Sequence, residues 1–172
     1  SGESMALKVI NKINGRLKFL YRKNRFLSFP LRRLLCNALI QPHFDYACCS
    51  WYSNLNKKLK DKLQVLQNKC IRFCLYLGNR DHIGPEEFQA INWLPVNDRF
   101  LQLVSSNAFK FFNSTCPICM SELFDATNEY HIDARSSLLK LKLPFCKTSK
   151  GQSSSSYLIP KVLNNLPQKL KL

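Results

Sequence analysis

Acidic residues are scarce in this sequence, which holds 11 Asp and Glu against 26 Lys and Arg in 172 residues, a net charge of +15. So large an excess goes beyond what solubility needs and favours a polyanionic partner, either nucleic acid or an anionic membrane. The scarcity also restricts catalysis, because polymerases and nucleases need paired metal-binding aspartates. The one adjacent acidic pair is Glu86 and Glu87, so we predict a chain with no catalytic residues of its own.

Glycine and long apolar runs are scarce as well. Five scattered glycines form no phosphate-binding loop, so we expect no cofactor in this chain. No apolar run reaches the roughly 18 to 20 residues that a membrane-spanning helix needs, and the first residues lack the apolar core of a signal peptide. We therefore expect an intracellular protein, in the nucleus or cytoplasm, with no membrane partner.

The positive charge lies almost entirely in the first half of the chain. Residues 1–80 contain 16 basic and 3 acidic residues, a net +13, whereas residues 81–172 contain 10 basic and 8 acidic residues, a net +2. A turn signal at Leu77-Gly78-Asn79 accompanies this change. We predict a basic helical domain over 1–80 and an extension over 81–172 that is helical to about residue 124 and irregular beyond it.

Helical periodicity dominates the pattern of apolar residues, so the predicted fold is mainly α: a small helical bundle followed by a helical and loop-rich extension. We expect helices over 4–23, from Ser28 to before Pro42, over 55–77, over 85–90, from Val96 through Phe111, and near 161–166. The second of these has a row of apolar residues that we expect to form its buried side. That row consists of Leu31, Leu34, Leu35, Ala38 and Leu39.

Basic residues line the polar faces of these helices with few acids to neutralise them. Lysine and arginine bind phosphates by releasing counterions and need no strict motif, which makes these residues candidate nucleic-acid contacts. A solvated surface and binding to a membrane surface are the alternatives. The candidate phosphate-contacting residues are Lys12, Arg16, Arg22, Lys23, Arg32, Arg33, Lys57, Lys58, Lys60, Lys62, Lys69 and Arg72.

Two other patterns suggest chemistry. His43 and Asp45 have the residue types of a catalytic pair, but no nucleophile accompanies them, and a turn that packs Phe44, Tyr46 and Trp51 inward explains them as well. Two of the eight cysteines, Cys116 and Cys119, have the spacing of a zinc knuckle, which His131 and Cys146 would complete as a weak metal site. Cys36, Cys70 and Cys74 fall in apolar helical rows, so we expect them to be reduced core residues.

A series of short motifs in a fixed order resembles the region beyond the catalytic palm in non-LTR retrotransposon reverse transcriptases of the Jockey and CR1 type. The motifs span nearly the whole chain. They are Ile13-Asn14-Gly15-Arg16-Leu17, Phe19-Leu20-Tyr21-Arg22, Ala38-Leu39-Ile40-Gln41-Pro42-His43-Phe44-Asp45-Tyr46, Ser50-Trp51-Tyr52, Leu66-Gln67-Asn68-Lys69-Cys70-Ile71-Arg72, Ile91-Asn92-Trp93-Leu94-Pro95-Val96, Arg99, Arg135-Ser136-Ser137, Lys147-Thr148 and Leu163-Asn164-Asn165-Leu166-Pro167.

This resemblance implies that residues 1–80 form the thumb, which grips the template–primer duplex, and that the later residues form a post-thumb extension. The catalytic aspartates of such a polymerase lie upstream, in the palm. The implied partners are an RNA or RNA–DNA duplex and the upstream palm and fingers of the same polyprotein. The chain opens without an initiator Met, so a fragment of a longer protein or a decayed copy is expected, and Met5 is an alternative start.

A different class of function is a protein–protein interaction module of the polyprotein. Trp51, Trp93 and the cluster Phe109–Phe112 would then form an exposed aromatic docking surface. Two departures from the family pattern also matter. Cys119 stands where an aromatic residue is usual, which weakens the zinc hypothesis, and Leu163 stands where a Trp is common.

Overall fold

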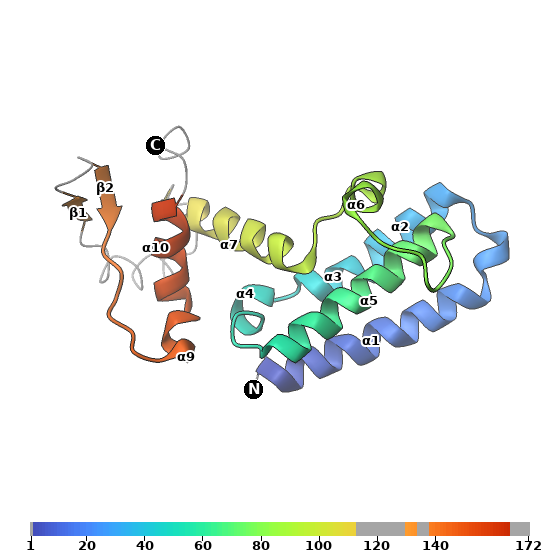
Figure 1. Cartoon of the computed structure of the whole chain (residues 1–172), viewed down its shortest axis with the longest axis horizontal. Coiled ribbons are helices and arrows are strands. Elements are labelled where there is room, and N and C mark those ends of the chain that lie inside the picture. Colours follow the sequence, from blue (N-terminus) through green and yellow to red (C-terminus); the bar gives the residue numbers. More distant parts are fainter. Residues whose placement is uncertain (1, 113–129, 134–137, 166–172) are drawn as a thin grey trace. The chain divides into compact units, whose positions relative to one another are not determined.

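The computed structural model describes residues 2–112, 130–133 and 138–165. The chain is mainly α-helical, as predicted (Figure 1). It divides into two compact units, residues 1–100 and 101–172. The first unit therefore includes all of the strongly basic residues 1–80 and continues for a further 20 residues beyond the change in charge.

The helices predicted from the sequence are present, with ends that differ by a few residues. In the first unit the elements are α1 (Gly2–Arg22), the 3-10 helix η1 (Asn24–Phe26), α2 (Phe29–Leu39), α3 (Gln41–Asp45), α4 (Cys48–Trp51), α5 (Lys57–Leu75) and α6 (Pro85–Ile91). Helix α7 (Val96–Phe112) begins in the first unit and ends in the second. The second unit also contains β1 (Tyr130–Asp133), β2 (Leu138–Leu141), α9 (Ser149–Gln152) and α10 (Ser155–Asn165).

Helices α1 and α5 pack side by side and form the centre of the first unit. They run in the same direction, because Asn56 before α5 donates a hydrogen bond to Glu3 near the start of α1, and Tyr21 near the end of α1 donates one to the backbone of Lys69. Each helix buries one apolar stripe, as its periodicity predicts. The stripe of α1 consists of Ala6, Val9, Ile13, Leu17 and Leu20.

Helix α5 has a clear signal at each end. The side chain of Asn56 caps its start by accepting a hydrogen bond from the backbone N–H of Leu59 at 2.9 Å. Its end is marked by Tyr76, which adopts a left-handed conformation with φ 60°. These caps fix the two ends of the helix that carries Lys57, Lys58, Lys60, Lys62, Lys69 and Arg72.

Helix α2 begins as predicted but buries a neighbouring side, turned by about 110° from the predicted one. Ser28 precedes it and Pro30 lies in its first turn, as the sequence indicates. However, its buried residues are Arg32 and Cys36, whereas Leu31 and Leu34 are exposed to 40% and 61%. The prediction of its buried side is therefore wrong. The physical reason is that α2 packs against α5 through Cys36 and through Arg32, which donates a hydrogen bond to the Phe73 carbonyl, so its leucines point outward.

The cysteines between α2 and α5 are core residues, as expected. Cys36, Cys70 and Cys74 are fully buried, and none of them forms a disulfide. A hydrogen bond to Cys74, followed by burial, raises the pKa of the Cys36 thiol far above its usual value. Burial likewise raises the pKa of Cys70, so Cys36 and Cys70 stay protonated and act as small apolar groups.

The second unit contains a two-stranded antiparallel sheet, in which Tyr130 pairs with Leu141 and Asp133 with Leu138. Helix α10 lies against β2. The sequence predicted an irregular tail here, but its serine-rich segment contains helix starts, because the Thr148 hydroxyl accepts a hydrogen bond from the N–H of Gly151 and so caps α9. The predicted continuation of helix from 113 to about 124 lies outside the described residues.

Candidate nucleic-acid interface

Three exposed lysines form a stripe along α5. Lys58, Lys62 and Lys69 lie within about 40° of one another around the helix, since successive residues are about 100° apart. All three are exposed, which confirms that Lys58 and Lys62 face solvent. Over the 11 residues from Lys58 to Lys69 the stripe is about 16 Å long, at about 1.5 Å per residue. We call these three residues the α5 lysine stripe.

Helix α1 adds two cations next to this stripe. The Tyr21 hydroxyl donates a hydrogen bond to the backbone carbonyl of Lys69 at 3.5 Å, which places that flank of α1 beside the stripe. Lys18 and Arg22 lie on the exposed side of α1 next to Tyr21, one helical turn apart. With the α5 lysine stripe they form a surface of five cations, which we call the α1–α5 basic face.

Two other predicted contacts, Lys12 and Arg16, lie on the opposite flank of α1. The Arg16 guanidinium donates a hydrogen bond to the backbone carbonyl of Leu39, at the end of α2. Burial, and then the charges of Arg16 and Lys12, lower the pKa of His43 in α3. Lys12 and Arg16 therefore belong to a second basic surface near α3, separate from the α1–α5 basic face. Lys23 is exposed just after α1.

Arg32 is part of the core. Only 9% of it is exposed, and its Nη1 donates a hydrogen bond to the backbone carbonyl of Phe73 at 3.4 Å. Its guanidinium carbon lies 4.8 Å from the ring centre of Tyr76. We therefore withdraw Arg32 from the predicted phosphate-contacting set, because the inward turn of α2 removes it from the surface. The neighbouring Arg33 is half-buried.

The remaining predicted residues of α5 are less available or face another way. Arg72 is half-buried and its Nε donates a hydrogen bond to the carbonyl of Asp81 at 3.0 Å. Lys60 is half-buried, with its ammonium 5.2 Å from the ring centre of Tyr52. Lys57 is exposed, but on the flank of α5 that also carries Asp61. Of the predicted set, Arg22, Lys58, Lys62 and Lys69 are thus the exposed residues that belong to the α1–α5 basic face.

The predicted set omits several exposed cations of the first unit, among them Lys8, Lys18, Arg25 and Arg80. Lys18 is the important one, because it belongs to the α1–α5 basic face. Its spacing of four residues from Arg22 was a usable signal, since residues four apart lie on one side of a helix. What the sequence could not show was which flank of α1 lies beside α5.

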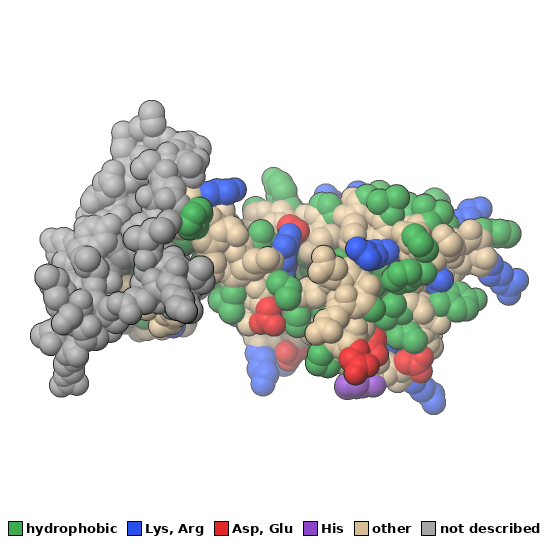
Figure 2. Space-filling model, turned by 90° about the horizontal axis from the view of Figure 1, so that it is seen from above, with side chains coloured by type: hydrophobic (Ala, Val, Ile, Leu, Met, Phe, Trp, Pro, Cys, Tyr) green, Lys and Arg blue, Asp and Glu red, His purple; other side chains and the backbone are tan. Residues whose placement is uncertain are grey.

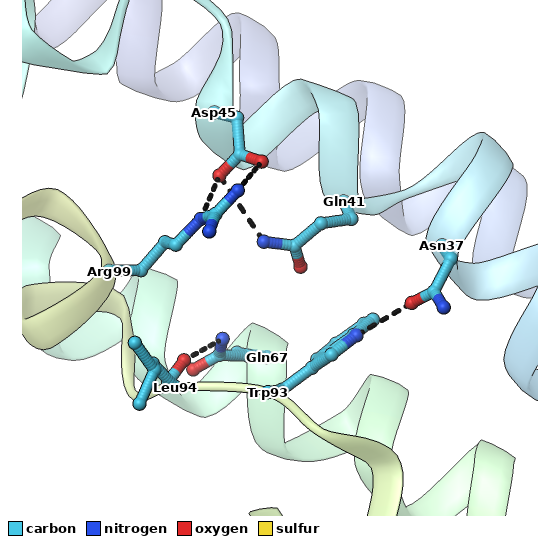
Figure 3. A network of polar contacts seen from close by, with 7 residues as sticks. All are labelled: Asn37, Gln41, Asp45, Gln67, Trp93, Leu94 and Arg99. Carbon is cyan, nitrogen blue, oxygen red and sulfur yellow. Dashed lines mark hydrogen bonds and ion pairs between the residues drawn. The ribbon is translucent and has the colours of Figure 1, made fainter. Parts of the chain in front are cut away.

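A polar network holds the first turn of α7 and the segment before it against α2, α3 and α5 (Figure 3). Arg99 binds Asp45 through two hydrogen bonds, from Nε to Oδ1 at 3.0 Å and from Nη2 to Oδ2 at 2.8 Å. This bond to Asp45 raises the pKa of Arg99. Gln41 donates a third hydrogen bond to Asp45, at 3.2 Å. Asp45 is therefore a structural anchor with no bond to His43, and the two residues do not form a catalytic pair.

Further bonds of this network involve Trp93 and Gln67. The Trp93 indole N–H donates to the side-chain oxygen of Asn37 at 2.7 Å, and the Gln67 amide donates to the backbone carbonyl of Leu94 at 2.8 Å (Figure 3). Trp93 and Trp51 are both buried. An exposed docking surface therefore cannot include either tryptophan.

The turn between α3 and α4 matches its prediction in part. Phe44 and Trp51 pack inward, as expected, whereas Tyr46 is 67% exposed, so the prediction for Tyr46 is wrong. Tyr46 instead contributes its backbone carbonyl, which accepts a hydrogen bond from the Trp51 indole N–H at 3.0 Å. Phe44 lies on the buried side of α3 and Trp51 on the buried side of α4, whereas Tyr46 lies between the two helices and points to solvent.

The predicted zinc ligands are only partly within the described residues. Cys116 and Cys119 lie outside them, and the side chain of His131 is not described. Cys146 is described and half-buried. Within residues 2–112, 130–133 and 138–165, no three His, Cys, Asp or Glu side chains come together as metal ligands would. Over the same residues, no helix is both long enough and apolar enough to cross a bilayer.

Comparison with known proteins gives no relative: no protein-family model, no curated protein and no solved structure matches this chain. Its chemistry must therefore be inferred from its own residues. The α1–α5 basic face presents ammonium and guanidinium donors on two helices packed side by side. Such a face can hold a row of phosphates, whereas cleaving or joining them would need metal-binding carboxylates.

Proposed function

We propose that this chain is a non-catalytic part of a retrotransposon RNA-directed DNA polymerase, and that it holds the RNA or RNA–DNA template–primer duplex through phosphate contacts. The proposal places it as the thumb and post-thumb region, with the palm and fingers of the same polyprotein as partners. The motif resemblance across nearly the whole chain supports the identity. The α1–α5 basic face supports the binding role.

The observation that carries the proposal is the α5 lysine stripe. Its three lysines are exposed on a helix that is anchored through a fully buried apolar side, so the charges are held in place by the core. Along the stripe's length of about 16 Å, a nucleic-acid duplex presents about nine phosphate charges, at one charge per about 1.7 Å. The three lysines can therefore contact about a third of these phosphate charges, as one row of contacts along a duplex that lies along α5.

Duplex shape, and not base sequence, is the expected feature of recognition. Lysine ammonium groups bind phosphates as point charges and read no base edges. An RNA or RNA–DNA duplex has a wide, shallow minor groove, whose rims present phosphates to a flat helical surface. We expect similar affinity for hybrid duplexes of unrelated sequence.

A salt titration tests the binding role. Affinity for an RNA–DNA hybrid of about two helical turns is measured by fluorescence anisotropy at several salt concentrations. Five phosphate contacts predict a slope of about −4 to −5 in a plot of log affinity against log salt concentration. A flat slope overturns the proposal, because it would mean that phosphates contribute little to binding.

A matched pair of charge reversals tests the assigned face. Lys58→Glu removes one cation of the stripe, whereas Lys57→Glu changes charge equally in the same turn of α5 but on its other flank. We expect Lys58→Glu to weaken binding about 10-fold and to reduce the magnitude of the salt slope by about one, and Lys57→Glu to have a clearly smaller effect. Equal losses would contradict the assignment of the face. Circular dichroism checks that both variants stay helical.

A further inference from the structure

The outward side of α2 is an apolar surface of the kind that helices normally bury. Leu31, Leu34 and Ala38 follow one another at three- and four-residue steps, and all three are exposed. Leu34 is 61% exposed, and Phe26 in η1, just before the helix, is 84% exposed. We call these four residues the α2 outer face. It is distinct from the α1–α5 basic face used in the proposed function.

A row of this kind is unusual on a surface in contact with water. Scattered exposed apolar residues are normal, but a continuous apolar helix face commonly marks a binding site. Figure 2 shows the side of the molecule on which α2 lies, and hydrophobic side chains gather there beside Lys and Arg. The sequence pattern predicts that this row is buried, but no other described part of the first unit covers it and it is exposed to solvent. A binding partner would resolve this conflict.

The charge around the α2 outer face indicates the partner's character. Residues 23–44, which include η1 and α2, contain four Lys and Arg and no acidic residue. Lys23 and Arg25 are exposed beside Phe26, and Arg33 lies half-buried on the flank of α2. A second copy of this chain would bring two positive rims together, which is unfavourable. The surface therefore favours a partner whose apolar residues are flanked by Asp and Glu.

The shape of the row favours a helix over a lipid surface or a nucleic acid. Leu31, Leu34 and Ala38 form a narrow ridge whose three- and four-residue steps match the grooves of another helix. Bases require stacking rings, of which this face has only Phe26. Membrane interfaces favour Trp and Tyr, which the row lacks. We propose that the α2 outer face binds an amphipathic helix of a partner protein, with an apolar stripe flanked by acidic residues.

Two synthetic peptides of about 18 residues, or five helical turns, serve as probes. They share the same leucine stripe, and one has Glu and the other Lys on its flanks. Binding to the full chain is measured by fluorescence anisotropy at physiological salt. We expect the Glu-flanked peptide to bind at least 10-fold more tightly than the Lys-flanked one.

Two substitutions of equal chemistry locate the site. Leu34→Asp places a charge in the middle of the α2 outer face and should weaken Glu-peptide binding at least 10-fold. Val65→Asp is the control, because Val65 is a similarly exposed apolar residue, 54% exposed, on α5. It should change peptide binding less than 2-fold. Leu34→Ser repeats the test without adding charge, in case Leu34→Asp loses helicity.

Several outcomes would overturn the proposal. They are equal binding of the two peptides, no binding of the Glu-flanked peptide, or binding that Leu34→Asp and Leu34→Ser leave unchanged. Leu34-dependent binding to phosphatidylcholine–phosphatidylserine vesicles without peptide binding would assign the face to lipid. Leu34-dependent self-association in sedimentation would assign it to a second copy. Hybrid-duplex affinity separates this site from the proposed function, since Leu34→Asp should leave it within 2-fold.

Discussion

Helices α5 and α2 pack against each other, but they bury and expose opposite kinds of side chain. Helix α5 buries leucines, cysteines and Phe73 and exposes lysines, whereas α2 buries Arg32 and Cys36 and exposes leucines. Both helices are amphipathic, so amphipathicity alone does not decide which side faces the core. The comparison shows that the neighbouring helix decides which side of an amphipathic helix is buried. The α5 surface offers α2 two small cysteines and, near its C-terminal end, a carbonyl that accepts a hydrogen bond from Arg32.

The largest expected difference between the two helices is in the cost of losing a leucine. Leu63→Ala on α5 should lower the free energy of unfolding by about 2 to 5 kcal/mol, because Leu63 is fully buried and the change leaves a cavity. Leu34→Ala on α2 should change it by about 0.5 kcal/mol or less. Urea denaturation followed by circular dichroism measures both. Equal losses would show that the α2 leucines are buried after all.

The next largest effect concerns two adjacent arginines of α2. Arg32→Ala removes the hydrogen bond to the Phe73 carbonyl and the contact with Tyr76, and should cost about 1 to 3 kcal/mol of unfolding free energy. Arg33→Ala should cost about 0.5 kcal/mol or less. Thermal and urea unfolding of both variants give the comparison. If Arg32→Ala instead lowers duplex affinity with unchanged stability, the inward placement of Arg32 is incorrect.

A smaller difference is expected between the residues that precede the two helices, in the unfolding free energy that each contributes. Asn56→Ala removes the side-chain cap of α5 and should cost about 1 kcal/mol. Ser28, at the corresponding position of α2, makes no side-chain capping bond, so Ser28→Ala should cost clearly less. Urea unfolding midpoints of the two variants provide the measurement. A larger loss for Ser28→Ala would reverse the comparison.

The smallest expected effect is a difference in alkylation rate between the cysteines that the two helices bury and a half-buried reference cysteine. Cys36, Cys70 and Cys74 should resist alkylation by iodoacetamide at pH 8 in the folded protein, because all three are fully buried and out of contact with solvent. The raised pKa values of Cys36 and Cys70 add to this resistance. The half-buried Cys49 serves as the internal reference and should react first. Mass spectrometry of peptides after timed labelling identifies the order. Early labelling of Cys36 would show that α2 leaves α5 easily.

The long helices could be predicted because their two sides differ strongly. In α5 every fourth or third residue from Leu59 to Cys74 is apolar, while the other positions are mostly charged or amide residues, so one arrangement is clearly best. Helix α2 is ambiguous, because its leucines form one apolar side while Cys36 and Ile40 form another. The longer leucine row suggested the wrong side, since periodicity does not include the shape of the neighbouring helix.

The candidate site could be predicted as a set of residue types but not as a surface. The excess of lysine on α5 is visible in the sequence, whereas the grouping of Lys18 with Lys69 depends on how α1 packs beside α5. The same limit applies to Asp45 and Arg99, which are 54 residues apart in the chain and meet only in the folded unit. His43, two residues from Asp45, was the nearer partner in sequence and is not its partner in space.

The parallel direction of α1 and α5 has a consequence for synthesis of the protein. Parallel neighbours cannot be joined by a short turn, so α2, α3 and α4 come between them in the chain. A growing polypeptide therefore exposes the apolar stripe of α1 until α5 leaves the ribosome about 55 residues later. At roughly 5 to 20 residues per second this delay is about 3 to 11 s. During that interval the nascent chain offers a binding site for chaperones that recognise exposed leucine and isoleucine.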